Sequence, residues 1–263
     1  MPKRRLDTLL AERGLFESRS RAAAAVMAGD VRLGGQGQRA LKPGQMVADD
    51  VAVAVADRPR FVSRGGTKLE NALDELGLDP SGRSCLDVGA STGGFTHCLL
   101  ERDADEVIAL DVAYGELNWK LRGDPRVTVI ERTNARSLDP ASLPYSPDLV
   151  VIDVSFISLA KVLPAVAAAA APSFDCLALV KPQFEVGRGQ VGKGGVVHSA
   201  DDRRAALVDV GRAARDHGLT VLAYASSGLP GPAGNRESFV WLAEGGRPGA
   251  VEDLEAAARR AEP

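Results

Sequence analysis

The spacing of apolar residues predicts an alternation of strands and helices over most of the chain. From residue 84 onward, short apolar runs alternate with segments in which apolar residues recur every three or four positions, which indicates a parallel sheet with helices on both faces. Its last strand follows a turn with no intervening helix, so we expect that strand to run antiparallel. The predicted strands are 84–88, 106–111, 126–131, 147–153, 175–181, 219–226 and 237–243, and the predicted helices are 94–102, 115–121, 158–170, 201–217 and 249–261.

The first residues show shorter elements of a different kind. Leu6, Leu9 and Leu10 lie at helical spacing and predict a helix over 4–13, and Ser18 is placed to cap a second helix over 19–28. Gly-rich turns and an alternating strand at 51–55 follow, so residues 1–56 are expected to form a small α+β domain. The basic, Pro- and Gly-containing stretch 57–66 is expected to be a linker. The larger domain would then be 67–263, beginning with a helix over 67–77.

Composition narrows the class of protein. With 263 residues, 45% of them hydrophobic, the chain is long enough for one large domain and a small one. Its longest apolar run, 162–172, is too short to cross a bilayer, and the start of the chain lacks the apolar segment of a signal peptide, so we expect a cytoplasmic protein. The three cysteines and three histidines show no metal-ligand spacing, so no metal site is expected.

The charge is unevenly divided along the chain. Residues 1–68 carry 13 basic and 7 acidic side chains, whereas the remainder carries 19 basic and 28 acidic ones. A basic module joined to an acidic domain indicates that the module binds nucleic acid, although a basic surface that is merely solvated would give the same count.

A glycine-rich turn at residues 89–94 is the first candidate binding site. It follows the strand 84–88 and opens a helix, but it has neither the Gly-Lys-Ser/Thr ending of a phosphate-binding loop nor the spacing of a dinucleotide fingerprint. Asp87, two residues before the first glycine, suits a cation better than a phosphate. S-adenosylmethionine is therefore the candidate cofactor, and an ordinary strand-to-helix turn is the alternative. Asp111 would accept hydrogen bonds from the ribose hydroxyls, and Asn134 is a candidate adenine contact or simply a turn former. The candidate cofactor-binding residues are Asp87, Gly89, Ala90, Ser91, Thr92, Gly93, Gly94, Phe95, Asp111 and Asn134.

Charged residues stand at the ends of apolar strands. Asp153 and Lys181 each end a fully apolar run, and Glu237 opens the last strand at the same edge of the sheet. Buried charges need partners, so we expect these side chains to meet, together with Lys68 from the preceding helix. The Lys68, Asp153, Lys181 and Glu237 set is either a catalytic group around one pocket or a structural ion-pair network.

Several motifs resemble known families. Residues 5–7, 18–19, 29–31 and 42–44 resemble the S4 domain, an RNA-binding module, which implies that Arg5, Arg19 and Lys42 face the RNA backbone. The four charged residues resemble the tetrad of FtsJ-like ribose 2′-O-methyltransferases. Together with it, the stretches 62–66, 89–96, 131–136, 153–159, 181–187 and 231–237 resemble the TlyA family of ribosomal RNA 2′-O-methyltransferases over nearly the whole chain.

The resemblance implies a Rossmann-like S-adenosylmethionine-dependent methyltransferase domain that methylates cytidine riboses of 23S, and in one subgroup also 16S, ribosomal RNA within ribosomal subunits. A ribose hydroxyl is a weak nucleophile, so it must be oriented and relieved of its proton, and Lys181 is the candidate for that role. Arg64 and Arg136 are candidate phosphate contacts, while Phe156 would either stack on an extruded base or pack in the core. We expect a monomer, with a mobile loop over residues 187–195.

Two departures from the family pattern are visible. Where some members have Arg-x-Trp-Val, residues 59–62 are Pro-Arg-Phe-Val, and His97 stands where an acidic residue is usual. Two alternatives to a methyltransferase are kept. In these alternatives the protein is either a non-catalytic RNA-binding ribosome factor or a haemolysin, a name that the family has sometimes carried.

Overall fold

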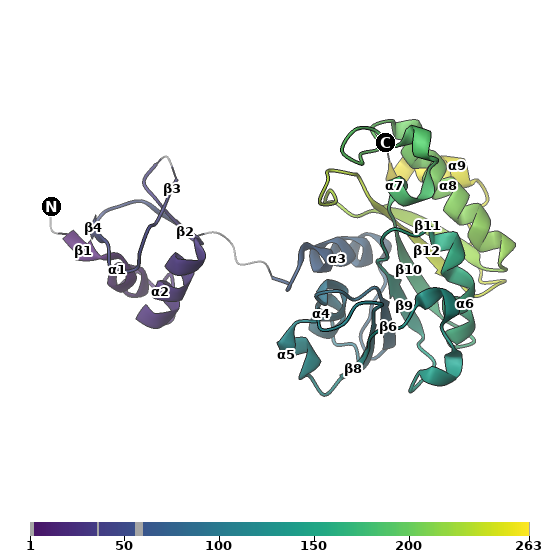
Figure 1. The fold of residues 1–263 in the computed structure, drawn as a ribbon, viewed down its shortest axis with the longest axis horizontal. Helices are drawn as coiled ribbons and strands as arrows, with labels where there is room; N and C mark the ends of the chain where they lie inside the picture. Colours follow the sequence, from purple (N-terminus) through teal and green to yellow (C-terminus); the bar gives the residue numbers. More distant parts are fainter. Residues whose placement is uncertain (1–2, 36, 56–59, 263) are drawn as a thin grey trace. The chain divides into compact units, whose positions relative to one another are not determined.

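The computed structural model describes residues 3–35, 37–55 and 60–262. It divides into two compact units, Met1–Pro59 and Arg60–Pro263, each with its own core (Figure 1). The predicted linker, 57–66, lies partly outside the described residues. Of its described part, Arg64 to Gly66 form the first turn of a helix.

The first unit is a small α+β fold. Helix α2 runs over Arg19–Ala28 as predicted, because the Ser18 hydroxyl accepts a hydrogen bond from the Arg21 amide (3.2 Å) at its start and Gly29 adopts a left-handed conformation at its end. Helix α1 starts at Leu6, because the residues before it pair as a strand with β4. The remaining elements are α1 (Leu6–Glu12), β1 (Lys3–Arg5), β2 (Val31–Leu33), β3 (Gln38–Arg39), β4 (Met46–Ala48) and β5 (Val53–Val55), with β2 between β3 and β5 in a three-stranded sheet.

The second unit is built on a seven-stranded sheet in the order β11-β12-β10-β9-β6-β7-β8. The neighbours from β10 to β8 are parallel, and β12 is antiparallel to both β10 and β11, which confirms the predicted insertion. Each strand lies within two residues of its predicted range. The strands are β6 (Ser84–Val88), β7 (Glu106–Leu110), β8 (Val127–Ile130), β9 (Leu149–Ile152), β10 (Asp175–Val180), β11 (Thr220–Ser226) and β12 (Ser238–Ala243).

Helices cover both faces of this sheet, as Figure 1 shows, so the predicted α/β class is confirmed. Successive strand residues point to opposite faces, which is why Leu86 and Val88 join the core under α6, α8 and α9, whereas Cys85 joins the core under α3, α4 and α5. The helices are α3 (Arg64–Leu76), α4 (Gly94–Glu101), α5 (Trp119–Arg122), α6 (Leu163–Ala169), α7 (Pro182–Glu185), α8 (Ala200–Asp216) and α9 (Leu254–Ala261).

Several helix starts differ from the prediction, and capping residues explain the differences. Helix α3 begins three residues early because the Ser63 hydroxyl accepts a hydrogen bond from the Gly65 amide (3.3 Å). Helices α5 and α9 begin late, where Asn118 and Asp253 cap them. The helix predicted over 158–170 is a short 3₁₀ turn followed by α6, and Pro164 lies in the first turn of α6, where its missing N–H costs nothing.

Candidate active site

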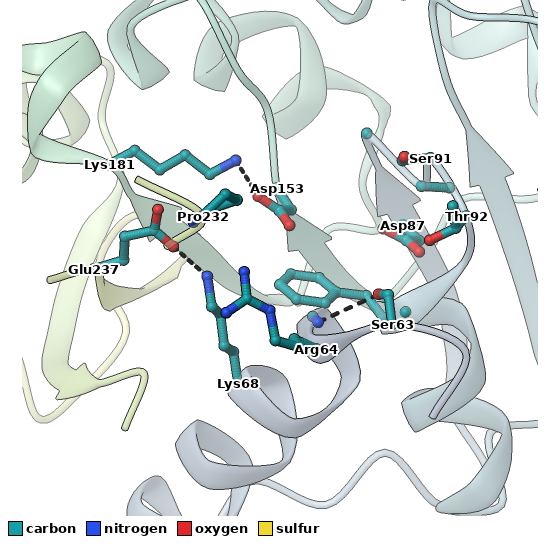
Figure 2. A pocket seen from close by; sticks show the side chains of 15 residues that line it. Ser63, Arg64, Lys68, Asp87, Ser91, Thr92, Asp153, Lys181, Pro232 and Glu237 are labelled. Carbon is teal, nitrogen blue, oxygen red and sulfur yellow. Dashed lines mark hydrogen bonds and ion pairs between the residues drawn. The ribbon is translucent and has the colours of Figure 1, made fainter. Parts of the chain in front are cut away.

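The carboxyl ends of the parallel strands surround a cavity of about 280 Å³. Its walls come from the glycine-rich turn after β6, from the first turns of α3 and α4, and from the ends of β9 and β10 (Figure 2). Ligands bind at this edge in open α/β sheets. The lining residues are Ser63, Arg64, Gly65, Lys68, Asp87, Gly89, Ala90, Ser91, Thr92, Gly94, Phe95, Asp153, Lys181, Pro232 and Glu237.

The four charged residues predicted to meet do so, as two ion pairs. The Lys181 ammonium nitrogen lies 2.6 Å from Asp153 Oδ1, as a charge contact without hydrogen-bond geometry, and donates a hydrogen bond to the Ser155 hydroxyl (2.9 Å). The Lys68 ammonium donates to Glu237 Oε2, and both of these side chains are buried. Figure 2 shows the two pairs side by side at the strand ends.

The topology of the sheet explains why these four side chains converge. Strands β9 and β10 are parallel, so the residues that follow them, Asp153 and Lys181, stand at the same edge. Strand β12 runs the opposite way, and its first residue, Ser238, pairs with Val180 at the end of β10. Glu237 therefore arrives beside Lys181 from the start of a strand, while Lys68 rises from α3.

The glycine-rich turn packs tightly against the end of β9. Gly89 has a φ of +85°, and a Cβ atom there would lie 2.5 Å from the Asp153 carbonyl oxygen. Gly93, the residue directly before α4, has a φ of +93°, so both positions need the conformational freedom of glycine. At Gly89 the backbone of the turn thus reaches the cavity and the end of β9 with no side chain in the way.

Asp87 is fully buried behind this turn. Its Oδ2 atom accepts hydrogen bonds from the Thr96 amide (2.8 Å) and hydroxyl (2.6 Å), whereas Oδ1 has no hydrogen-bond partner among the described residues. Burial raises the pKa of Asp87 to about 7, and the nearby Asp153 carboxylate adds to this effect while the Thr96 hydrogen bonds oppose it. The cavity therefore has an unpaired, buried acceptor in its wall.

A second cavity, of about 500 Å³, shares Gly89, Ser91 and Asp153 with the first. Asp111 lines it, and its carboxylate accepts hydrogen bonds from the amides of Ser91 (2.7 Å) and Ala113 (2.8 Å). Of the candidate cofactor residues, Asp87, Ala90, Thr92, Gly94 and Phe95 line the first cavity, Asp111 and Asn134 line the second, Gly89 and Ser91 line both, and Gly93 lines neither.

Asn134 has a local structural role, because its side chain accepts a hydrogen bond from the Arg136 amide (3.0 Å) and caps a 3₁₀ turn. The turn-forming reading of this residue is correct, and the residue also faces the second cavity.

The candidate RNA contacts of the second unit lie at the rims of these cavities. Arg64 lines the first cavity, and Arg136 and Phe156 line the second. Phe156 is 91% exposed, has a φ of +64° and holds its ring 5.2 Å from the ring of Phe184, so it does not pack in the core.

In the first unit, two of the three candidate RNA contacts share one acidic partner. Arg5 donates two hydrogen bonds to the buried Asp7 (3.1 and 2.8 Å), and Arg19 Nε lies 3.2 Å from Asp7 Oδ2. The Arg5 hydrogen bonds, with help from Arg19, hold the pKa of the Asp7 carboxyl well below its usual range. Lys42 is exposed in the segment before β4, and Gly44 of that segment packs against the Arg5 guanidinium.

The two departures from the family pattern contact each other. The Phe61 and His97 rings meet edge to face at 5.6 Å, and the Val62 amide donates to His97 Nδ1 (3.2 Å). Phe61 is buried against Gly66, so the start of the second unit is fastened to α4 next to the cavity wall.

Sequence reasoning missed several residues of the site. Ser155, which holds Lys181, follows Asp153 by two positions, and its place just beyond a strand end was the available signal. Thr96 was not predicted, because its hydrogen bonds to Asp87 join residues on the two sides of the glycine-rich turn. Ser63 shows the ordinary pattern of a helix cap.

Within the described ranges, no cluster of three or more His, Cys, Asp or Glu side chains is arranged to hold a metal ion. The same part of the chain contains no helix with the length and apolar character needed to cross a membrane.

Comparison with known proteins defines the class to which this fold and site belong. Residues 61–244 match the FtsJ-like methyltransferase family, and residues 4–50 match the S4 domain. The 16S/23S rRNA (cytidine-2′-O)-methyltransferase TlyA of Mycobacterium tuberculosis is 51% identical over 240 residues, which cover 90% of this chain and 89% of that protein. The 23S rRNA (cytidine-2′-O)-methyltransferase TlyA of Campylobacter jejuni is 35% identical over 182 residues, 69% of this chain and 70% of that protein.

A solved structure from Streptococcus thermophilus, which carries a hemolysin name, is 39% identical and superposes with a TM-score of 0.75 over 99% of this chain and 96% of its own. The chain therefore belongs to the FtsJ-like methyltransferases that carry an S4 domain, and within them to the TlyA family. The family resemblance drawn from the sequence motifs is confirmed.

Proposed function

We propose that the protein transfers a methyl group from S-adenosylmethionine to the 2′-hydroxyl of a cytidine ribose in ribosomal RNA, within ribosomal subunits. The observation that carries the proposal is the meeting of the Lys181–Asp153 and Lys68–Glu237 pairs in one cavity with the glycine-rich turn. The TlyA relatives are named for this reaction.

The residues around the turn fit S-adenosylmethionine. Within the part of the chain that the structure describes, the buried Asp87 Oδ1 has no hydrogen-bond partner, so it would accept a hydrogen bond from the ammonium group, and the backbone of Gly89 to Gly94 leaves room beside it. Asp111, at the second cavity, would receive the ribose hydroxyls. Three carboxylates, Asp87, Asp111 and Glu116, flank this space, which favours a cationic ligand over a phosphate. When bound, S-adenosylmethionine supplies a methyl group activated by its sulfonium.

The tetrad would prepare the acceptor. Asp153 and Ser155 hold the Lys181 side chain in place at the cavity, where its nitrogen would orient the 2′-hydroxyl and, in the neutral amine form, take up the hydroxyl proton as the oxygen is methylated. Lys68 and Glu237 neutralise each other and form the neighbouring part of the cavity wall, which would fix the position of the ribose.

The candidate RNA contacts suit a target nucleotide drawn out of structured RNA. The exposed Phe156 ring offers a stacking surface beside the second cavity, and Arg64 and Arg136 would bind phosphates. Arg5, Arg19 and Lys42 of the S4 domain would add backbone contacts that position RNA without reading its sequence. Cytoplasmic location and the monomeric state stay predictions.

The test is incubation of unmodified 30S and 50S subunits, separately and assembled, with methyl-labelled S-adenosylmethionine, followed by mapping of 2′-O-methyl positions. We expect label in cytidine riboses of the 23S RNA, and label in the 16S RNA as well if this chain shares the double specificity named for the M. tuberculosis relative. Failure to bind S-adenosylmethionine in calorimetry would favour a non-catalytic RNA-binding factor instead. Lysis of protein-free liposomes by the purified protein would favour the haemolysin reading.

A further inference from the structure

Residues 187–198 form a glycine-rich loop between α7 and α8 that is hydrogen-bonded to the turn 231–235. Its first half folds on itself, since the Gly187 amide donates to the Gln190 side chain (3.0 Å), which in turn donates to Asp202 of α8 (2.7 Å). Its second half turns back at Gly192, whose amide donates to the Val196 carbonyl (2.9 Å). These few hydrogen bonds hold the loop in its conformation and attach it to α8.

Asn235 makes the central bonds to this loop. Its Oδ1 atom accepts from the Val197 amide (2.9 Å) and its Nδ2 group donates to the Gly195 carbonyl (2.8 Å). Only 1% of Asn235 is exposed, so both polar ends of the side chain need these partners. An Asn amide can serve a donor and an acceptor of one backbone segment at once, which an apolar or purely acceptor side chain cannot.

Asn235 also shapes the turn that presents Glu237. The Gly231 amide donates to the Asn235 backbone carbonyl (2.8 Å), which closes the turn 231–235. Gly231 lies against the Glu237 carboxylate so closely that a Cβ atom would collide with it, and Pro232 lines the cavity. Asn235 therefore bonds to the glycine-rich loop with its side chain and, with its backbone, closes the turn that leads to Glu237.

The far side of the loop is fixed independently. The Arg203 guanidinium donates to the carbonyls of Val197 (3.2 Å) and His198 (2.8 Å), and it is held by two hydrogen bonds to the buried Glu262 (2.9 and 2.7 Å). With that end anchored to α8 and to the end of α9, Asn235 lies between a rigid support and the catalytic carboxylate.

We propose that Asn235 is a positioning residue, which clamps the glycine-rich loop to the turn 231–237 and so holds the Glu237 carboxylate beside Lys68. The inference rests on the proposed methyl transfer and names a further residue for it. Displacement of a catalytic group by about 1 Å costs about 100-fold in rate. The candidate cofactor-binding residues Asp87, in β6, and Asp111, directly after β7, lie on other strands, so release of the clamp acts on turnover and not on cofactor binding.

The experiment compares Asn235→Ala and Asn235→Asp with the wild type in the full chain. It measures kcat and KM on ribosomal subunits, cofactor affinity by calorimetry, and amide hydrogen exchange over residues 187–198. For Asn235→Ala we expect kcat to fall about 10- to 100-fold with KM and cofactor affinity changed less than about threefold, and faster exchange at Val197. Asn235→Asp keeps the acceptor for Val197 but replaces the donor to Gly195 with an oxygen that faces the Gly195 carbonyl, so its kcat should also fall below that of the wild type.

Tyr224→Phe is the matched control, because it also removes one buried hydrogen bond of the same unit, to the Leu207 carbonyl (3.0 Å), away from the loop. It should lose stability with kcat unchanged. Normal kcat in Asn235→Ala, or a joint loss of kcat and cofactor affinity in Asn235→Asp, would overturn the inference. If Asn235→Ala does not fold, Asn235→Asp decides alone. A wild type that binds cofactor but methylates no subunit would instead overturn the proposed function, while the exchange data would still test the clamp.

Discussion

Lys181 is held by two different partners, and the pair explains how a flexible side chain can serve a precise reaction. A lysine side chain loses up to about 2 kcal/mol of rotamer entropy when it is fixed. The Asp153 carboxylate and the Ser155 hydroxyl offset this cost, and both come from the segment directly after β9. The Lys181 nitrogen is thus fixed by the protein before any substrate arrives.

The first prediction concerns this pair. Lys181→Ala and Asp153→Ala should each lower methyl transfer to ribosomal subunits by about 100-fold or more, because the hydroxyl would be neither oriented nor deprotonated. Label incorporation measures the effect, and calorimetry should show that cofactor still binds Lys181→Ala. Lys161→Ala, which removes an exposed lysine of the same unit, is the control and should keep full activity. Persistent transfer in both active-site variants would refute the assigned roles.

Asp87 makes stability depend on pH with a sign opposite to that of most carboxylates. An aspartate in an unfolded chain titrates at about 4, whereas burial raises the pKa of Asp87 in the folded protein to about 7. Between these values the folded protein holds more protons than the unfolded chain, so the free energy of unfolding falls as pH rises. Ionisation of Asp87 lowers the free energy of unfolding by on the order of 4 kcal/mol. This destabilisation is complete above pH about 7 and absent below pH about 4.

The second prediction follows from that difference. Asp87→Asn keeps an acceptor for Thr96 and has no carboxyl to ionise, so its unfolding free energy should rise relative to the wild type as pH increases from about 5 to 8. Urea denaturation at several pH values measures this. Parallel pH profiles for the two proteins would show that Asp87 does not titrate in this range.

At the residue scale, the sequence identifies the charged residues of the site better than it predicts the exposure or backbone conformation of a single side chain. Asp153, Lys181 and Glu237 are recognisable because each adjoins an apolar strand, and buried charges must pair. The sequence around Phe156 predicts neither its exposure nor its positive φ. Both depend on the path of the segment after β9, which places the Phe156 ring next to the ring of Phe184. Ser155 stands just beyond the end of β9, which is a signal in the sequence, but its contact with Lys181 depends on the same segment.

The glycine-rich turn is the element on which both cavities depend. It follows β6, the strand between β9 and β7, and it touches the end of β9 through the close approach of Gly89 to the Asp153 carbonyl. The turn therefore shapes the candidate cofactor site and contacts the end of β9 at Asp153 at the same time.

The third prediction tests this close approach. Gly89→Ala places a Cβ atom where the Asp153 carbonyl stands, so we expect cofactor affinity to fall by about tenfold or more and methyl transfer to fall further. Calorimetry and label incorporation measure the two effects. Gly218→Ala is the control, because Gly218 has a similar φ of +78° but open space around it, so it should cost stability alone. Equal behaviour of the two variants would contradict the proposed importance of the contact.

At the element scale, the strands of the seven-stranded sheet are predicted well, whereas the short strands of the first unit and several helix starts are predicted poorly. A fully buried parallel strand is an uninterrupted apolar run, which is visible in the sequence. A helix start depends on which of several polar residues caps it, as Ser63, Asn118 and Asp253 show. The short α7 has no apolar period to reveal it, because only Pro182 of its four residues is buried.

The two units have separate cores, and this separation predicts separable activities. Apolar side chains of α1, α2 and β2 form the core of the first unit, whereas the site lies in the second. The basic charge concentrated in residues 1–68 fits a division between RNA capture and chemistry.

The fourth prediction is that removal of residues 1–56 leaves cofactor affinity within about twofold of the full chain and reduces methylation of subunits by about 100-fold or more, since phosphate contacts supply much of RNA affinity. Calorimetry and label incorporation measure the two. Undiminished methylation by the truncated protein would show that the S4 domain is not needed to deliver the substrate.

The position of β12 in the sheet determines the order in which parts of the second unit can form during synthesis. It is threaded between β10 and β11, so β10 keeps an open edge until residues 238–243 have left the ribosome and folded. The same segment brings Glu237 to Lys68. During synthesis the set of four charged residues is thus completed by the strand that fills the gap between β10 and β11, and a prematurely ended chain lacks both the complete set and a protected edge.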